Sequence, residues 1–400
     1  MSKIYDLINE LCPNGVKFKK IGDIANYRRG SFPQPYTNQS YYGGEGSMPF
    51  VQVADVREDF KLVSQTKNTI SKIAQPQSVF VPSETVIVTL QGTIGRVAIT
   101  QYDSYVDRTL AIFENLSPDL DRKYFAYQLK NKFDYEKQFA RGSTIKTITK
   151  EEMTEFKIAI PPLEVQEEIV RILDKFGELE AELEAELEAR KNQYEFWRGK
   201  LLEKKNDWNT IKLKDISNFE NGKGHEKVVS DNGKYILLTS KAVSTDLEKY
   251  RRTDQQLLPL YKDDIALVMS DLPNGRALAK CYFVEENDKF TLNQRVCRIT
   301  TTDDKVYPKY LYYFLNRNNQ LLKFDNGVDQ TNLRKNDILE VDVYYPSISR
   351  QKEIVDVLEQ FEKLINNIYE GLPAEIELRK KQYEYYRNKL LSFEELSVGE

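Results

Sequence analysis

The chain has 400 residues, of which 40% are hydrophobic and 30% charged, and its mean hydropathy is −0.59. This length predicts two or three folding units. No apolar run reaches the roughly 18 residues of a membrane-spanning helix, and residues 1–12 lack the pattern of a secretory signal. Three cysteines without a CxxC spacing indicate reduced thiols in a cytoplasm. The single histidine, His225, excludes zinc sites that need two histidines and argues against histidine-based catalysis.

The formal net charge of −4 argues at first against binding to nucleic acid, but the charge is unevenly distributed. Residues 16–160 carry 20 basic and 16 acidic side chains, and residues 206–345 carry 21 of each. Residues 161–205 carry 8 basic and 12 acidic side chains, and residues 346–400 carry 8 and 11. The excess acid therefore lies in two short segments, and the two long segments are neutral to basic.

The chain is a tandem repeat of one unit, a mixed domain followed by a long helix. Residues 161–176 match residues 346–361, and residues 190–202 match residues 379–391. A repeat of this period defines the fold of the whole chain. It predicts a first domain at residues 1–160 and a central helix at 161–205. A second domain follows at 206–345, then a C-terminal helix at 346–395 that is interrupted near 371–373, and a short tail at 396–400.

The elements of the two globular domains predict an α+β fold. In the first domain, β-branched runs at 49–53 and 86–89 are strand signals bounded by glycine, proline and serine. Residues 122–131 in the first domain and 308–317 in the second have the pattern of helices.

The central helix follows a heptad pattern. From Ile169 to Leu201, apolar and aromatic residues recur at alternating steps of four and three, and Trp197 is one of them. Glu180 and Arg190 are the polar interruptions of this seam.

The C-terminal helix repeats the seam from Ile354 to Leu390, with one extra step of four between Leu372 and Ile376. This step coincides with Gly371-Leu372-Pro373, a sequence that interrupts helices. A long helix with an apolar seam needs a partner, so we expect the two helices to pair with each other in a coiled coil. The alternative is that each helix packs on its own globular domain.

Motifs for catalysis are missing from the sequence. There is no GxxxxGK[ST] phosphate loop, no GxGxxG after a strand, and no Asn or Asp followed by Pro-Pro and an aromatic residue. The pairs Asp263-Asp264 and Asp303-Asp304 have no third ligand at useful spacing, so we interpret them as solvated turns.

Basic and polar residues cluster instead in glycine-containing loops, and these loops differ between the two copies far more than the helices do. Arg, Asn, Gln, Ser and Thr side chains read base edges, and Arg and Lys also contact phosphates. Ordinary solvated loops are the alternative, and the recurrence of Arg96 and Arg276 in both copies is equally compatible with a structural role. The candidate DNA-binding residues are Arg28, Arg29, Ser31, Gln91, Thr93, Arg96, Arg141, Ser143, Thr144, Lys146, Lys223, His225, Lys227, Asn274, Arg276, Gln330, Thr331 and Asn332.

Together these features resemble the specificity subunit of type I restriction–modification enzymes. The most specific parts are residues 190–198 and 379–387, and the resemblance covers nearly the whole chain. It implies two tandem target-recognition domains of mixed α/β structure, separated by two long helices that form an antiparallel intramolecular coiled coil. Each domain would read half of a split double-stranded DNA sequence. The insertion of Pro273-Asn274 before Gly275 leaves the loop-to-loop correspondence between the copies open.

The resemblance also implies partners and cofactors. Two methyltransferase subunits would dock on the helices and methylate adenine at N6, and two motor/nuclease subunits would complete the restriction enzyme. S-adenosylmethionine, ATP and magnesium would then bind to those partners, and this chain would carry no cofactor, metal or catalytic residue. Candidate docking residues on the exposed helix faces are Glu164, Glu167, Arg171, Lys175, Glu353 and Glu359.

One feature of the central helix fits this resemblance. Residues 179–182, 183–186 and 187–189 are tandem Leu-Glu-Ala units, which are good helix formers. In this family such four-residue units set the spacing between the two recognition domains.

The alternative functions of the whole chain are a non-catalytic coiled-coil adaptor and a divergent DNA-modifying enzyme.

Overall fold

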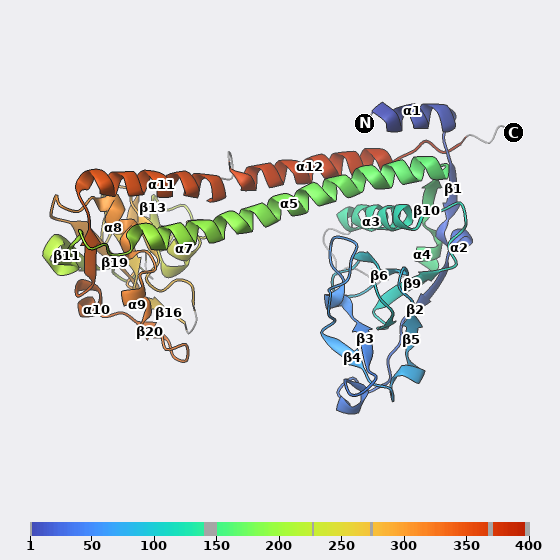
Figure 1. Ribbon diagram of the computed structural model, residues 1–400, viewed down its shortest axis with the longest axis horizontal. Helices are drawn as coiled ribbons and strands as arrows, with labels where there is room; N and C mark the ends of the chain where they lie inside the picture. The colour runs from blue at the N-terminus through green and yellow to red at the C-terminus, as the bar shows by residue number, and fades with distance from the viewer. Residues whose placement is uncertain (1, 140–149, 226–227, 273–274, 367–370, 397–400) are drawn as a thin grey trace. The chain divides into compact units, whose positions relative to one another are not determined.

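The structure is a computed structural model that describes residues 2–139, 150–225, 228–272, 275–366 and 371–396. The chain divides into two compact units (Figure 1). The first consists of residues 1–185 and 375–400, and the second of residues 186–374. None of the described helices is long and apolar enough to cross a membrane.

The first unit contains two four-stranded sheets, with strand orders β2-β9-β6-β7 and β4-β3-β8-β5, and a separate β1–β10 pair. Its strands are β1 (Lys17–Lys20), β2 (Asn26–Arg29), β3 (Met48–Val51), β4 (Asn68–Ile70), β5 (Val79–Val81), β6 (Val86–Thr89), β7 (Val97–Ile99), β8 (Ser104–Val106), β9 (Leu110–Glu114) and β10 (Lys157–Ile160). Its helices are α1 (Ser2–Leu11), α2 (Ile21–Ile24), α3 (Arg122–Phe139), α4 (Lys150–Glu155), the first part of α5 (Leu163–Leu202) and most of α12 (Leu372–Leu391), with short 3-10 turns η1 (Gln39–Tyr41), η2 (Val53–Asp55) and η3 (Gln75–Gln77).

The second unit repeats this plan, with sheets β12-β19-β15-β17 and β14-β13-β18 and the pairs β11–β21 and β16–β20. Its strands are β11 (Asn209–Lys212), β12 (Ser217–Asn221), β13 (Tyr235–Leu238), β14 (Arg251–Thr253), β15 (Ile265–Val268), β16 (Ser270–Asp271), β17 (Cys281–Phe283), β18 (Phe290–Leu292), β19 (Val296–Thr301), β20 (Thr331–Asn332) and β21 (Asp342–Tyr345). Its helices are the last part of α5, α6 (Leu213–Ile216), α7 (Ser240–Ser244), α8 (Pro308–Leu315), α9 (Asn319–Leu322), α10 (Lys335–Leu339) and α11 (Ile348–Asn366).

The main sheets of the two units match strand for strand. β2, β9, β6 and β7 correspond to β12, β19, β15 and β17, and all neighbours in both sheets run antiparallel. In each unit a second sheet contains one parallel pair, β3 with β8 and β13 with β18. The prediction of two tandem mixed domains with long helices is therefore confirmed.

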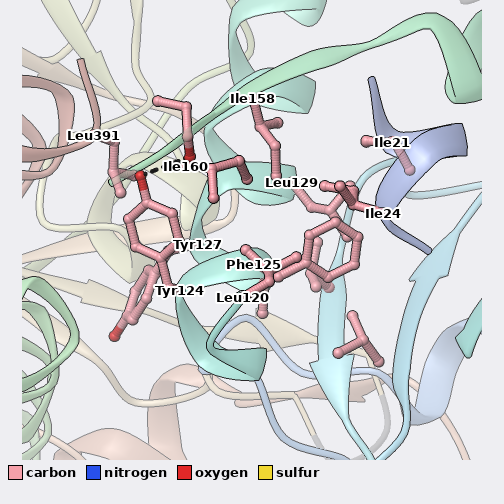
Figure 2. Packing of buried hydrophobic residues seen from close by; sticks show 14 of the residues in the cluster. Ile21, Ile24, Leu120, Tyr124, Phe125, Tyr127, Leu129, Ile158, Ile160 and Leu391 are labelled. Carbon is pink, nitrogen blue, oxygen red and sulfur yellow. Dashed lines mark hydrogen bonds between the residues drawn. The ribbon is translucent and has the colours of Figure 1, made fainter. Parts of the chain in front are cut away.

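The core of the first unit joins segments from both ends of the chain. Leu391 from α12 packs in the same cluster as Tyr124 of α3 and Ile160 of β10 (Figure 2). The backbone of Val16 pairs with the C-terminal segment, where its N–H donates to the Glu394 carbonyl at 2.9 Å. Burial of these apolar side chains is the main force that holds α12 on this unit.

A buried glutamine anchors the start of each long helix in its own unit. Gln351 is fully buried, accepts a hydrogen bond from the Tyr307 N–H at 2.8 Å and donates to the carbonyls of Lys305 and Pro346. Gln166 occupies the equivalent position and makes the same three types of bond. A buried amide is tolerated only when its polar atoms are paired, so the repeat preserves both the residue and its partners.

In the first unit, α5 and α12 pair antiparallel. The rings of Phe176 and Tyr386 stack at 5.5 Å, and further along both helices Lys380 lies 2.9 Å from Glu184. Positions 176 and 184 on α5 thus meet positions 386 and 380 on α12, so sequence number rises on one helix as it falls on the other. Figure 1 shows the two helices side by side.

In the second unit, α5 pairs with α11, and here one seam residue was predicted wrongly. The Tyr194 ring packs against Phe361, and its hydroxyl donates to Glu362 at 2.7 Å. Trp197, however, is 44% exposed, and the neighbouring Arg198 turns inward instead, with its side chain 13% exposed. An undistorted helix drifts by about 20° per heptad, so after four heptads from Ile169 position 197 has left the seam.

The described residues of the C-terminal segment form two helices, α11 and α12. α11 ends at Asn366 and α12 begins at Leu372, with Pro373 in the first turn of α12, where proline is tolerated.

The long helices pair with each other and also pack on their own domains, so both predicted arrangements hold in part. Ile354 and Leu358 of α11, like Ile169 and Leu173 of α5, are buried in the core of their own unit, while the more distal seam residues contact the partner helix.

Candidate nucleic-acid interface

Three loops of the first unit meet at one end of the sheet β2-β9-β6-β7. We call this end of the sheet, where the strands end or begin, the loop edge. β2 and β6 end at this edge, whereas the antiparallel strands β7 and β9 begin there. The loop after β2 is tied to β9 by a hydrogen bond from the Gly30 N–H to the Leu110 carbonyl at 3.2 Å. The loop after β6 is tied to the β8–β9 turn by the Leu90 N–H and the Thr109 carbonyl, 2.8 Å apart. The structure thus brings together the two loops that carry the candidate residues 28–31 and 91–96.

The second unit builds the same edge with the same bonds. The Gly222 N–H donates to the Val296 carbonyl at 2.9 Å, and the Met269 N–H donates to the Arg295 carbonyl at 2.9 Å. A further loop joins this edge through the short β16–β20 pair, in which Thr331 faces Asp271. The segments that carry the candidate residues Lys223, Arg276 and Gln330 therefore lie together at this end of the sheet.

The predicted arginines of the first unit differ in how they are engaged. Arg28 forms an ion pair with Glu114 and donates to the Phe80 carbonyl, so its guanidinium is directed back along the sheet. Arg96 forms an ion pair with Glu58 at 2.7 Å, which favours the structural role considered for it. Arg29 is exposed and donates to the Tyr27 hydroxyl at 3.2 Å.

The other predicted residues of this surface are mostly exposed. In the first unit Gln91 and Thr93 are exposed, and the half-buried Ser31 donates to the Gln77 carbonyl. In the second unit Lys223, Arg276, Gln330 and Asn332 are exposed, Gln330 donates to the Ser270 hydroxyl at 2.8 Å, and Thr331 is buried in β20. DNA contact by these residues stays a prediction. The predicted residues Arg141, Ser143, Thr144, Lys146, Lys227 and Asn274 lie outside the described residues.

His225 was predicted wrongly as a residue of the DNA-contacting surface. Its side chain is only 1% exposed, and both ring nitrogens are occupied. Nδ1 lies 2.7 Å from the Lys223 carbonyl oxygen, and Nε2 lies 3.2 Å from the Thr291 hydroxyl. In this position the ring ties the loop after β12 to β18 and cannot reach a base.

The acidic pair Asp263-Asp264 also differs from its interpretation as a solvated turn. Asp264 is 1% exposed, accepts hydrogen bonds from the Tyr261 N–H and the Thr300 hydroxyl, and burial raises the pKa of its carboxyl group. Among the described residues, no cluster of three His, Cys, Asp or Glu side chains could hold a metal ion.

The predicted docking residues lie on exposed helix faces or in ion pairs. Glu164 and Glu167 are exposed, and Lys175 pairs with Glu178 at 3.3 Å. Arg171 donates to Glu168, which also pairs with Lys3 of α1, and these contacts lower the pKa of the Glu168 carboxyl group to about 2.

On α11, the predicted docking residue Glu353 pairs with Arg350, and Glu359 pairs with Lys309. The last pair repeats the Lys123–Asp174 ion pair of the first unit, which indicates that Glu359 has a structural role.

Sequence reasoning missed two features of these surfaces. One is the turn at 107–110 with its counterpart at 293–296, which carries no glycine and gave no loop signal. The other is a pair of aromatic side chains at equivalent positions of the repeat, Phe196 on α5 and Tyr385 on α12, which are each 59% exposed. Both residues stand next to seam positions in the sequence, so the heptad pattern did not mark them as exposed. Their outward direction became evident only from the helix packing.

The paired loop surfaces on two mixed domains agree with the family that comparison with known proteins gives. A family model described as the type I restriction modification DNA specificity domain matches residues 13–189 and again residues 205–378. The two matches cover most of the chain and coincide with the two copies of the repeat. The chain belongs to this family and is a type I restriction–modification specificity subunit.

Individual relatives agree with this assignment. The specificity subunit of a type I restriction enzyme of Escherichia coli is 32% identical over 249 residues, which cover 58% of this chain and 60% of that protein. A specificity subunit of Methanocaldococcus jannaschii is 23% identical over 401 residues, covering 92% of this chain and 91% of that one. A solved chain of a type I restriction–modification system has a TM-score of 0.64 at 15% identity over 95% of this chain and 98% of that one, which shows the shared fold.

Proposed function

We propose that each unit reads one half of a split double-stranded DNA target, and that the chain supplies recognition without chemistry. The observation that carries this proposal is the loop edge built twice on the same backbone bonds, with different exposed side chains in each copy. One scaffold with two different surfaces fits a protein that recognises two different half-sites. Affinity comes mainly from phosphate contacts and falls steeply as the salt concentration rises.

We further propose that two methyltransferase subunits dock on the long helices and methylate adenine at N6, and that two motor/nuclease subunits join them for restriction. The exposed Phe196 and Tyr385 support this stoichiometry, because each unit presents one aromatic side chain at the same position of the repeat. Aromatic residues of this kind are frequent anchors of protein interfaces. In this proposal S-adenosylmethionine, ATP and magnesium bind to the partners, and the complex works on DNA in the cytoplasm.

Mapping N6-methyladenine in cells with and without this chain tests the proposal. We expect a split motif that disappears on deletion, and a changed half-site when residues 1–155 are replaced by another recognition domain. A methylation map that does not depend on the chain would overturn the proposal. Methyl transfer by the purified chain alone, with S-adenosylmethionine and DNA, would instead support a divergent enzyme.

The Leu-Glu-Ala units of α5 give a second test of the same proposal. They lie within one continuous helix, with Leu183 and Leu187 half-buried and the glutamates between them exposed. Deletion of residues 183–186 shortens the helix by about 6 Å, close to two base-pair steps. We expect the unread gap of the target to change while both half-sites stay the same. An unchanged gap would contradict the proposed role of the helix as a spacer.

A further inference from the structure

The turn that joins β8 to β9 in the first unit has a structural twin between β18 and β19 in the second. In both four-residue turns the backbone N–H of the fourth residue donates to the carbonyl oxygen of the first. The Leu110 N–H donates to Asp107, and the Val296 N–H donates to Asn293, each at 3.0 Å. In both turns the side-chain oxygen of the first residue also accepts a hydrogen bond from the backbone N–H of the third residue, at 2.9 Å for Asp107 and 3.4 Å for Asn293. Such a turn is closed by its own side chain and holds one backbone shape.

Each turn is also clamped from two sides in the same way. A Cβ atom at Gly30 would lie 2.1 Å from the Val106 carbonyl oxygen, and one at Gly222 would lie 2.0 Å from the Asn293 carbonyl oxygen. Only glycine allows the preceding strand to pass this close. On the other side, the loops after β6 and β15 donate to the carbonyls of Thr109 and Arg295. The two turns are therefore fixed parts of the loop edge.

The side chains on these fixed turns differ and point outward. Arg108 is exposed in the first turn, and Arg295, one position later, is exposed in the second. Neither guanidinium forms an ion pair within the described residues, in contrast to Arg28 and Arg96. An arginine without a protein carboxylate partner keeps its donors available for a ligand.

Arg108 is oriented by aromatic contacts. Its guanidinium carbon lies 5.3 Å from the centre of the Tyr36 ring, which stacks on Phe32 at 5.0 Å. The Tyr36 hydroxyl donates to Asp107, the buried first residue of the same turn, at 2.5 Å. A planar guanidinium stacked on a ring that is itself held in place loses little freedom when it binds.

We propose that Arg108 and Arg295 determine sequence specificity, each by reading a guanine in the half-site of its own unit. This inference rests on the proposed function, because it assumes that the loop edges face DNA. The two donors of an arginine fork match the O6 and N7 acceptors of guanine in the major groove, and this geometry discriminates strongly against other bases.

The test uses the full chain assembled with its methyltransferase subunits and compares methylation motifs and rates on substrates that differ at one base. For Arg108→Ala we expect one guanine preference in the first half-site to weaken by roughly 10- to 100-fold, with the second half-site and the gap unchanged. Arg295→Ala has the corresponding effect in the second half-site only. Arg108→Lys keeps the charge and loses the fork, so it loses the same preference while the salt dependence of binding is retained.

Arg122→Ala is the matched control, because Arg122 is an exposed arginine of the same unit that pairs with Glu84, which precedes β6 and lies away from the loop edge. We expect the wild-type motif from this variant. A uniform loss of rate on all substrates with Arg108→Ala, with the motif unchanged, would show a phosphate contact and overturn the inference. An unchanged motif and rate would overturn it as well. A wild-type complex without any split motif is a different result, since it defeats the proposed function itself.

Discussion

In the first unit the clamped turn presents Arg108, and in the second the same turn presents Arg295, although the hydrogen bonds beneath the two are equivalent. The anchors at the other end of each unit are likewise equivalent, from the buried glutamines to the Lys123–Asp174 and Lys309–Glu359 ion pairs. These contacts of the skeleton are thus repeated, while the exposed side chains carried on it differ. This separation allows recognition to change without a cost in folding.

The units also differ in the skeleton, and one difference is the cover over the start of the long helix. In the first unit α1 packs there, with Ile4 fully buried, and Ile172 of α5 is 7% exposed. Its counterpart on α11, Val357, is 41% exposed. The same helix start is therefore shielded in one unit and open in the other.

The largest expected effect tests the repeated glutamine anchors. Gln351→Leu leaves one buried N–H and two carbonyls without their partner, at a cost of about 1 kcal/mol or more for each, so we expect the second unit to lose about 3 kcal/mol of unfolding free energy. Both tryptophans, Trp197 and Trp208, lie in this unit, so urea unfolding followed by tryptophan fluorescence reports on it.

Gln166→Leu is the matched variant in the first unit, where hydrogen exchange at α3 and β10 reports the loss. Equal losses within about 1 kcal/mol support the equivalence of the two anchors. A loss in only one unit would break the comparison.

A smaller effect is expected at the glycine that lets the strand pass the turn. Gly30→Ala places a methyl group against the Val106 carbonyl, and we expect a loss of about 1–3 kcal/mol in the stability of the first unit and of recognition of its half-site. Gly222→Ala has the same effect in the second unit. Gly177→Ala is the control, because nothing lies within 4 Å of its added Cβ on α5, and alanine there raises stability by up to about 1 kcal/mol. A neutral Gly30→Ala variant would argue that the turn is not clamped.

The sequence predicted the parts of the fold that depend on local pattern. The repeat and the long helices follow from periodicity and backbone chemistry within a few residues, whereas Leu372 and Pro373 of the predicted interruption lie in the first turn of α12. The seam failed at Trp197 because a heptad count assumes 3.5 residues per turn, and over 29 residues an ordinary helix brings Arg198 to within about 20° of the direction of Ile169 instead.

Site residues depended on contacts that the sequence does not display. His225 lies between lysines and glycines like a surface residue, but it is buried because Thr291 from a distant strand receives its ring. The turn at Arg108 was missed for the converse reason, since it is held in place by backbone hydrogen bonds to three distant residues, Gly30, Val51 and Leu90. Loops found by composition lie together at one end of each main sheet where the structure describes them, and the individual side chains within them could not be ranked from composition.

The difference in cover over the helix starts gives a pH-dependent prediction. Glu168 is 5% exposed and pairs with Arg171 and with Lys3 of α1, and its pKa is about 2, compared with 4.5 for an unperturbed glutamate. A lowered folded-state pKa stabilises the fold above pH 4.5, and this stabilisation is lost as the pH falls toward 2. Because both cationic partners are well exposed, we expect less than about 1 kcal/mol at neutral pH.

The measurement is hydrogen exchange of α1 in wild type and Glu168→Gln between pH 7 and pH 3. We expect the variant to be less protected at pH 7 and the difference to narrow below pH 4.5. Glu353→Gln in the second unit is the control, because Glu353 is 58% exposed and pairs only with Arg350 among the described residues. A difference that is constant with pH would show that the Glu168 side chain acts by packing and not by charge.

The smallest effect tests the pairing of α5 with α12. Lys380 bridges Glu184 at 2.9 Å and Glu180 at 3.5 Å, and Lys381 next to it pairs only within its own helix, with Glu377 at 3.5 Å. We expect Lys380→Ala to lower the stability of the first unit by about 0.2–1 kcal/mol at low salt, and Lys381→Ala to change it less. In 1 M NaCl the difference between the two variants should vanish, because ion pairs at this exposure are screened. If the difference persists in high salt, the apolar stem of Lys380 is what contacts α5. The pairing of the helices would then depend on packing alone, led by the stacked rings of Phe176 and Tyr386.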